Sequence, residues 1–216
     1  MTAHDKPLIR LHGFRTWDRS GKARWTLTEL GLPFENRWLN SEKKEHETPE
    51  YLKLNPMGRV PVLEIDGHLF FESNAICLYL ADRFGQKKLA PSPDSPDRPR
   101  YLQWMFFSEA TIAPIQAKIQ IVEDIPPGEL FQKKESALTS DFNDVLETLD
   151  QGLRGDFLLG DRLSTADLCV SYQLFFAMLW PELATHADRH PRVLAYLERM
   201  KKLPSADKCK IFSYPD

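Results

Sequence analysis

The chain has 216 residues, a formal net charge of -3 and three widely spaced cysteines. This length suffices for one large domain or two small ones. The small net charge argues against a nucleic-acid partner, and no apolar stretch reaches the roughly 20 residues that cross a membrane. The N-terminal residues lack an apolar signal core, and neither the cysteines nor the histidines show metal-site spacing. We therefore expect a cytoplasmic protein without a metal site.

The first 85 residues show alternating strand and helix patterns. Asp66-Gly67 is a strong hairpin turn between two apolar runs, and Ser73 can begin a helix with apolar side chains at helical spacing. The order β-α-β-β-β-α indicates an α/β thioredoxin-like domain, with a mixed four-stranded sheet and helices packed on it. The expected strands lie at 7–13, 33–40, 60–65 and 69–71, and the expected helices at 20–30 and 73–84.

The composition changes after Gly85. Residues 86–97 are rich in proline and charge and predict a linker. Apolar residues at helical spacing follow, Ser164 and Asp167 can form a capping box, and Pro191 opens a last helix. The second half is therefore expected to be an all-helical bundle. The predicted domains are 1–85 (thioredoxin-like), 86–97 (linker) and 98–216 (helical).

Two ligand-binding features lie close together between residues 55 and 79. Val60 lies beside Pro61 where a strand begins, so its backbone edge is not fully paired and can bond to a peptide. Ser73 lies at a helix N-terminus, which suits a carboxylate. The pair predicts a small acidic peptide as the ligand.

Three motifs in this order resemble those of the cytosolic glutathione transferases. They are KARWTLTELGLPFE (22–35), NPMGRVPVL with FESNAI (55–63 and 71–76) and GDRLSTADL (160–168). The resemblance covers residues 9 to about 200, has phi-, tau- and nu-like features, and leaves the class unassigned. It implies a cytoplasmic homodimer that binds glutathione as co-substrate and conjugates it to an apolar electrophile, typically in detoxification.

The same resemblance implies roles for the residues around Val60. Pro61 would follow a cis peptide bond, and the Val60 backbone would bond to the cysteinyl part of glutathione. Glu72 and Ser73 would hold the γ-glutamyl end, although Ser73 can also simply cap its helix. Arg59 and His46 are the main candidates for the glycyl end, and Lys44, Trp38 and Asn40 are further ones.

The group that activates the glutathione thiol is expected at the start of the first helix. An ungapped count places Trp17 where the family usually has serine or cysteine, and the nearest hydroxyls belong to Ser20 and Thr16. These three are the catalytic candidates, while Ser20 can alternatively be only a helix cap. Backbone N–H groups, or the charges of Arg15 and Arg19, would stabilise the thiolate if no hydroxyl does so.

The electrophile is expected to bind among mainly apolar side chains. The candidates are Phe14, Trp17, Trp104, Phe107, Ser108 and Thr111, of which the last four have the spacing of one helix face. The alternative for the aromatic residues is a place in the core. Alternative functions are a glutathione-dependent peroxidase or disulfide reductase, or a non-catalytic glutathione-binding module. A zeta-like isomerase is a weaker alternative, because the Ser-Ser-Cys run of that class is absent.

Overall fold

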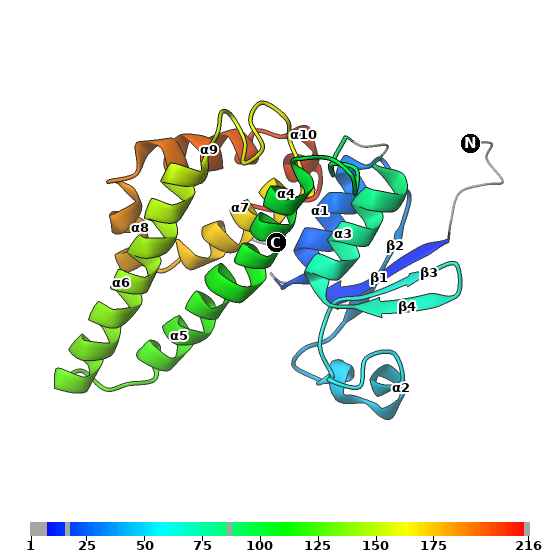
Figure 1. Cartoon of the computed structure of the whole chain (residues 1–216). Coiled ribbons are helices and arrows are strands. Elements are labelled where there is room, and N and C mark those ends of the chain that lie inside the picture. The colour runs from blue at the N-terminus through cyan, green and yellow to red at the C-terminus, as the bar shows by residue number, and fades with distance from the viewer. Residues whose placement is uncertain (1–7, 16–17, 86–87, 214–216) are drawn as a thin grey trace. The chain divides into compact units, whose positions relative to one another are not determined.

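The computed structural model describes residues 8–15, 18–85 and 88–213. The chain forms two compact units (Figure 1). The first comprises the chain up to Lys87 together with the residues from Pro204 onward, and the second comprises Lys88–Leu203. Within the described ranges, every helix is too short or too polar to cross a bilayer.

The first unit contains a four-stranded mixed sheet of order β2-β1-β3-β4 (Figure 1). β1 is parallel to β2 and antiparallel to β3, and β3 is antiparallel to β4. Asp66 and Gly67 join β3 to β4 with φ values of 50° and 78°, as a primed two-residue turn requires. The strands are β1 (Ile9–Phe14), β2 (Glu35–Leu39), β3 (Val62–Ile65) and β4 (His68–Phe71). The predicted thioredoxin-like arrangement is confirmed.

Helices α1 (Ser20–Glu29) and α3 (Ser73–Phe84) pack on each other in this unit. Ile9 and Leu11 of β1 are buried in the same core, while Arg10, between them, is partly exposed. This alternation gives the sheet one apolar face under the helices and one polar face.

Two short helices occupy the segment that the sequence predicts only as a polar connection. They are the 3-10 helix η1 (Glu45–Glu47) and α2 (Pro49–Leu52). Thr48 caps α2, since its side chain accepts a hydrogen bond from the Tyr51 N–H, and Pro49 takes the first helical position. The Thr48 cap and Pro49 at the first position thus favour the single helical turn of α2.

The chain returns to the first unit through α10 (Pro204–Lys208). The buried Trp25 indole N–H donates to Ser205 Oγ at 2.8 Å, and the Trp25 ring meets Phe212 edge-on at 5.2 Å. The sequence predicts that the helical domain spans residues 98–216, whereas the residues from Pro204 onward belong to the first compact unit. A bond between residues 180 positions apart leaves no local pattern in the sequence.

The second unit is entirely helical in its described residues, as predicted. Its central helix, α7, is buried on nearly all sides, and α4, α5 and α9 pack against it. The helices are α4 (Arg98–Phe107), α5 (Ala113–Glu123), α6 (Glu129–Gly152), α7 (Thr165–Ala177), α8 (Pro181–Ala187) and α9 (Pro191–Lys201). A π-helical turn, η2 (Ser108–Ile112), lies between α4 and α5. Pro114 accounts for it, because its ring displaces the carbonyl four residues earlier.

The predicted capping box at the start of α7 is confirmed. The Asp167 carboxylate accepts hydrogen bonds from the Ser164 N–H at 2.8 Å, the Ser164 hydroxyl at 2.6 Å and the Leu158 N–H at 2.9 Å. Asp167 is completely buried, and this burial raises its pKa from 3.8 to about 6. One side chain thus holds both the α7 N-terminus and the preceding loop.

Candidate functional site

A cavity of about 450 Å³ in the first unit brings together most of the predicted glutathione-binding residues. We call it the Val60 cavity. It is lined by Arg19, Asn55, Met57, Arg59, Val60, Pro61, Phe71, Glu72 and Ser73. His46 is not among these lining residues. Asn55, Met57 and Phe71 were not predicted, although the 71% exposure of Met57 marks it as an unusually exposed apolar side chain.

The backbone around Val60 lies beyond the end of a strand ladder. The β1–β3 pairing ends at His12 and Val62, and the peptide bond between Val60 and Pro61 is cis. Val60 is half-buried and lines the cavity. Among the described residues, the β1–β3 pairing does not extend to the Val60 backbone.

The N-terminus of α3 forms another wall of the cavity. Ser73 is the first residue of this 12-residue helix and is 3% exposed, while Glu72 before it is exposed. Glu72 has a φ of 72°, which is uncommon for a residue other than glycine. Such conformations concentrate at functional sites, and the helix end supplies N–H groups and a partial positive charge.

The Val60 cavity carries charges of both signs. Arg19 and Arg59 contribute two guanidinium groups, and Glu72 contributes one carboxylate. This set can hold a ligand with two anionic groups and one cationic group. The cavity is therefore suited to a zwitterionic peptide with an excess of negative charge.

Ser20, one of the three catalytic candidates, is buried and does not line the Val60 cavity. Its hydroxyl accepts a hydrogen bond from the Arg24 guanidinium at 2.9 Å, and its N–H donates to the Asp18 carboxylate. Asp18 also accepts from the Phe14 N–H at 2.8 Å, and burial raises the Asp18 pKa. Asp18, rather than Ser20, thus supplies the side chain that holds the start of α1.

The other two catalytic candidates, Thr16 and Trp17, lie outside the described residues. Arg19 is the described residue of this loop that lines the Val60 cavity. The positive charge of Arg19, one of the predicted alternatives to a hydroxyl for stabilising the thiolate, therefore lies at this cavity.

A second cavity in the first unit, of about 420 Å³, contains the weaker candidates for the glycyl end. It is lined by Phe14, Arg15, Trp38, Leu39, Asn40, Ser41, Glu42 and Glu45. The guanidinium groups of Arg24 and Arg15 lie 4.6 Å and 5.7 Å from the centre of the Trp38 ring. His46 lies against Phe14, with ring centres 5.1 Å apart. Most of the first-unit residues predicted to bind glutathione or the electrophile therefore line two separate cavities, the Val60 cavity and this second one.

The four electrophile candidates in the second unit divide between the core and the surface. Trp104 and Ser108 are buried, and the Ser108 hydroxyl donates to the Cys169 carbonyl at 3.0 Å. Phe107 and Thr111 instead line a cavity of about 310 Å³ between the α4–α5 segment and α6. Of the four, Phe107 and Thr111 are therefore the two that a ligand can reach in this unit.

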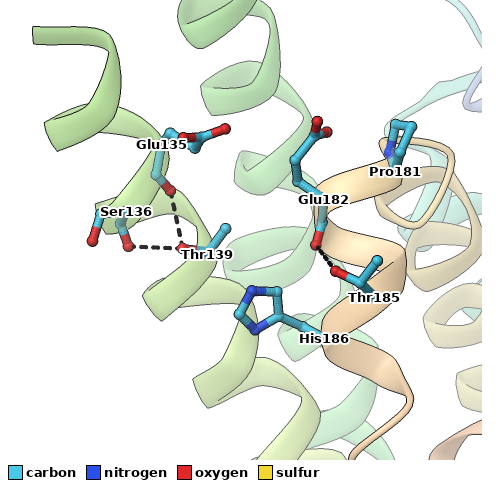
Figure 2. Close-up of a pocket in the computed structure, with 7 residues that line it drawn as sticks. All are labelled: Glu135, Ser136, Thr139, Pro181, Glu182, Thr185 and His186. Atoms are coloured by element: carbon cyan, nitrogen blue, oxygen red, sulfur yellow. Dashed lines mark hydrogen bonds between the residues drawn. The ribbon is translucent and has the colours of Figure 1, made fainter. Parts of the chain in front are cut away.

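A further cavity of about 500 Å³ lies between α6 and α8 (Figure 2). Thr139 and Thr185 donate their hydroxyls to carbonyls of their own helices. His186 points into the space between the two helices (Figure 2). None of the predicted site residues lines this cavity, and the described residues contain no group of three or more His, Cys, Asp or Glu placed to hold a metal.

Comparison with known proteins points to one family. The chain matches the model of the glutathione S-transferase N-terminal domain over residues 8–82 and that of the C-terminal domain over residues 132–199. Glutathione S-transferase 1 of Schizosaccharomyces pombe is 32% identical over 178 residues, or 79% of this chain and 75% of the relative. Maleylacetoacetate isomerase of Dictyostelium discoideum is 36% identical over 138 residues, or 62% of each protein.

A solved structure shares the fold over almost the whole chain. It is glutathione transferase URE2P6 of Phanerochaete chrysosporium, in complex with oxidised glutathione. Its TM-score is 0.84 with 25% sequence identity, and the match covers 97% of both chains.

Proposed function

The chain belongs to the glutathione S-transferase family, and we propose that it conjugates glutathione, held in the Val60 cavity, to an apolar electrophile. One observation carries the proposal: Val60, Ser73, Glu72 and two arginines line the same cavity. Glutathione has two carboxylates, one ammonium group and a central peptide. The α3 N-terminus at Ser73 and the Arg59 guanidinium suit the two carboxylates, Glu72 suits the ammonium group, and the Val60 backbone suits the peptide.

The proposed orientation follows from the chemistry of each wall. The γ-glutamyl carboxylate binds at Ser73 and the α3 N-terminus, and Glu72 pairs with the ammonium group. The Val60 backbone exchanges hydrogen bonds with the cysteinyl residue, and Arg59 attracts the glycyl carboxylate. His46, Trp38 and Asn40 stay predictions for the glycyl end.

The reaction needs the thiolate of glutathione. A free thiol has a pKa of about 8.5 and is mostly protonated at neutral pH. We propose that the Arg19 charge favours the thiolate, because Arg19 lines the cavity whereas the Ser20 hydroxyl is buried against Arg24. The thiolate then attacks the electrophilic carbon, a sulfur–carbon bond forms, and the leaving group departs with its electron pair. Thr16 and Trp17 stay candidates for a direct hydrogen bond to the sulfur.

The electrophile is proposed to contact Phe107 and Thr111. Both line a cavity that contains the apolar side chains of Ile115 and Val145 and also the charged side chains of Lys118, Asp141 and Asp144. The apolar character of the acceptor therefore rests on the family resemblance. Phe14, Trp104 and Ser108 stay predictions. The homodimer and the cytoplasmic location are proposals that rest on the family resemblance.

The isomerase relative favours one second candidate function. In that reaction a glutathione thiolate would add to a cis double bond and then leave, which releases the trans product. The same Val60 cavity would hold glutathione in both reactions. Turnover assays with an aryl halide, a hydroperoxide, a disulfide and a cis-unsaturated diketone distinguish the conjugating, peroxidase, reductase and isomerase activities.

Titration of the bound thiol tests the proposal. We expect Arg19→Gln to raise the pKa of glutathione bound to the protein by about half a unit or more. Ser20→Ala and the matched surface change Arg189→Gln should leave this pKa unchanged. A rise in Ser20→Ala or Thr16→Val but not in Arg19→Gln would replace the charge mechanism by a hydroxyl. Glutathione binding without turnover of any of the four substrates would instead indicate a binding module.

A further inference from the structure

Two buried side chains hold the loop that presents Val60. The Tyr51 hydroxyl and the Asn55 amide nitrogen both donate to the carbonyl oxygen of Arg59, each at 2.8 Å. Tyr51 is 4% exposed and Asn55 is 3% exposed. Both bonds are made within the chain itself.

The Arg59 carbonyl and the Val60 N–H belong to the same peptide unit. Because that unit is planar and trans, the two groups point in opposite directions. A carbonyl held by two donors therefore determines the direction of the Val60 N–H. Val60 lines the Val60 cavity, so the two donors orient a backbone group at the edge of the proposed glutathione site.

Asn55 also shapes the rest of this loop. Its side-chain oxygen accepts the Met57 N–H at 3.0 Å, and its carbonyl accepts the Gly58 N–H at 2.9 Å. Gly58 has a φ of 58°, which glycine adopts without strain. Asn55 thus accepts two backbone hydrogen bonds that close the turn before Arg59.

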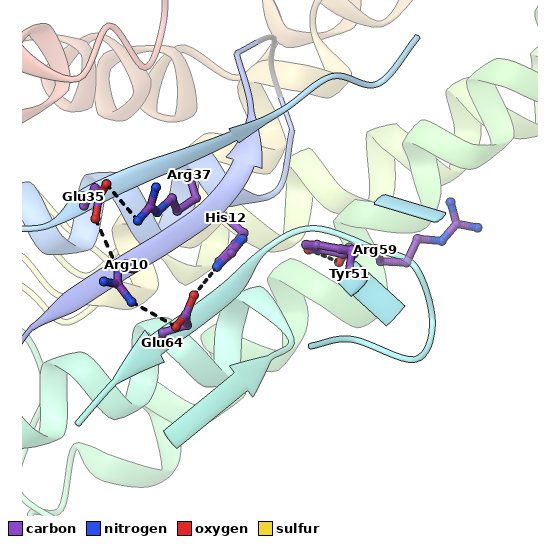
Figure 3. Close-up of polar contacts among 7 residues, drawn as sticks. All are labelled: Arg10, His12, Glu35, Arg37, Tyr51, Arg59 and Glu64. Atoms are coloured by element: carbon purple, nitrogen blue, oxygen red, sulfur yellow. Dashed lines mark hydrogen bonds and ion pairs between the residues drawn. The ribbon is translucent and has the colours of Figure 1, made fainter. Parts of the chain in front are cut away.

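Tyr51 is itself anchored to the polar face of the sheet (Figure 3). Its ring lies 5.9 Å from the His12 ring, centre to centre. His12 Nε2 lies 2.5 Å from Glu64 Oε1, and Glu64 Oε2 lies 3.6 Å from the Arg10 guanidinium. Side chains from β1 and β3 therefore support the ring that holds the Arg59 carbonyl.

We propose that Tyr51 and Asn55 are positioning residues for glutathione, acting through the Arg59–Val60 peptide. This inference rests on the proposed function of the Val60 cavity. A loop that is ordered in advance loses less conformational entropy when the ligand binds. Loss of either donor should therefore weaken glutathione binding more than it weakens the fold.

Tyr51→Phe removes one hydroxyl and leaves the ring against His12. Asn55→Asp retains the oxygen that accepts the Met57 N–H but replaces the donor to the Arg59 carbonyl by an acceptor. Tyr196→Phe is the matched control, because the Tyr196 hydroxyl is also buried and donates to a backbone carbonyl, that of Asp167, at 3.2 Å. All three variants keep the size of the original side chain.

Isothermal titration with glutathione, thermal unfolding and amide hydrogen exchange at Val60 provide the readouts. We expect Tyr51→Phe to weaken glutathione binding about three- to tenfold, the range that one net hydrogen bond supports, and Asn55→Asp to weaken it further. The KM for glutathione should rise while kcat is retained, and exchange at the Val60 amide should accelerate. Tyr196→Phe should lower the thermal midpoint without changing glutathione affinity, KM or exchange at Val60.

The results separate this inference from the proposed function. If the wild-type chain binds glutathione and both Tyr51→Phe and Asn55→Asp bind it equally well, the positioning role is refuted. If Tyr196→Phe weakens binding as much as Tyr51→Phe, the effect is one of general stability and the inference also fails. If the wild-type chain does not bind glutathione, the proposed function fails and the inference falls with it. If Tyr51→Phe unfolds, hydrogen exchange at the Val60 amide in Asn55→Asp decides the matter, because glutathione affinity in that variant also responds to the new negative charge in the cavity wall.

Discussion

Replacing Asp167 by alanine should strongly destabilise the second unit. Asp167 is completely buried and accepts two backbone N–H groups and one hydroxyl at 2.6–2.9 Å. Alanine leaves the N–H groups of Leu158 and Ser164 without these acceptors. The Ser164 hydroxyl also loses its acceptor.

The expected loss can be worked out from these contacts. A buried donor left without a partner costs about 1–3 kcal/mol, so two of them cost about 2–6 kcal/mol. Against this, alanine removes a buried carboxylate whose pKa, raised from 3.8 to about 6, indicates that its charge is poorly solvated. At pH 4, where the carboxyl is protonated and this offset is absent, we therefore expect Asp167→Ala to lower the free energy of unfolding by about 2–6 kcal/mol.

Urea unfolding followed by circular dichroism measures this loss. Asp141→Ala is the matched control, because Asp141 is half exposed and pairs with Lys118 on the surface. That change should alter the free energy of unfolding by no more than about 1 kcal/mol. The reasoning is refuted if Asp167→Ala stays within the same limit, or if the control loses as much.

Three further predictions concern charge, binding and packing. Because the folded-state pKa of Asp167 is raised, its stabilisation is complete below about pH 4 and is lost as the pH rises through 6. The wild-type chain should thus lose about 2 kcal/mol relative to Asp167→Ala between pH 4 and pH 7, and parallel pH profiles would contradict this. Ser73→Ala should weaken glutathione binding about tenfold or more in calorimetry, since it removes a hydrogen bond to a carboxylate. Ser136→Ala, an exposed serine, should have no effect. Gly152→Ala should cost about 1–3 kcal/mol in urea unfolding, because its new methyl group would overlap the buried Trp104 ring. Equal stability of Gly152→Ala and the exposed Gln151→Ala would contradict that packing argument.

Features with a local chemical cause could be predicted from the sequence. Asp66-Gly67 closes its hairpin because the turn needs two positive φ values. Ser164 and Asp167 form their capping box because the two side chains are three residues apart at a helix start. Val60 and Ser73 share one cavity because a short hairpin joins them.

Features that depend on how the side chains pack in the folded chain could not be predicted in this way. Ser20 is a catalytic candidate in the sequence, but in the folded chain its hydroxyl is buried and accepts a hydrogen bond from Arg24, one helical turn onward. The sequence alone assigns no role to Asn55, because its hydrogen bond to the Arg59 carbonyl depends on the folded shape of the loop. The spacing from Trp104 to Thr111 predicts one helix face, whereas the structure places Trp104 in the core and Thr111 in a surface cavity.

The return of the chain to its first unit has a consequence for the order in which the protein can mature during synthesis. The ribosome completes the sheet early, yet the Trp25 indole N–H receives its partner only when Ser205 has been made. Until then the nascent first unit lacks the Ser205 acceptor and the Phe212 ring that contact Trp25 in the complete chain. A fragment that ends before Pro204 should therefore be a better chaperone substrate and protease target than the full chain.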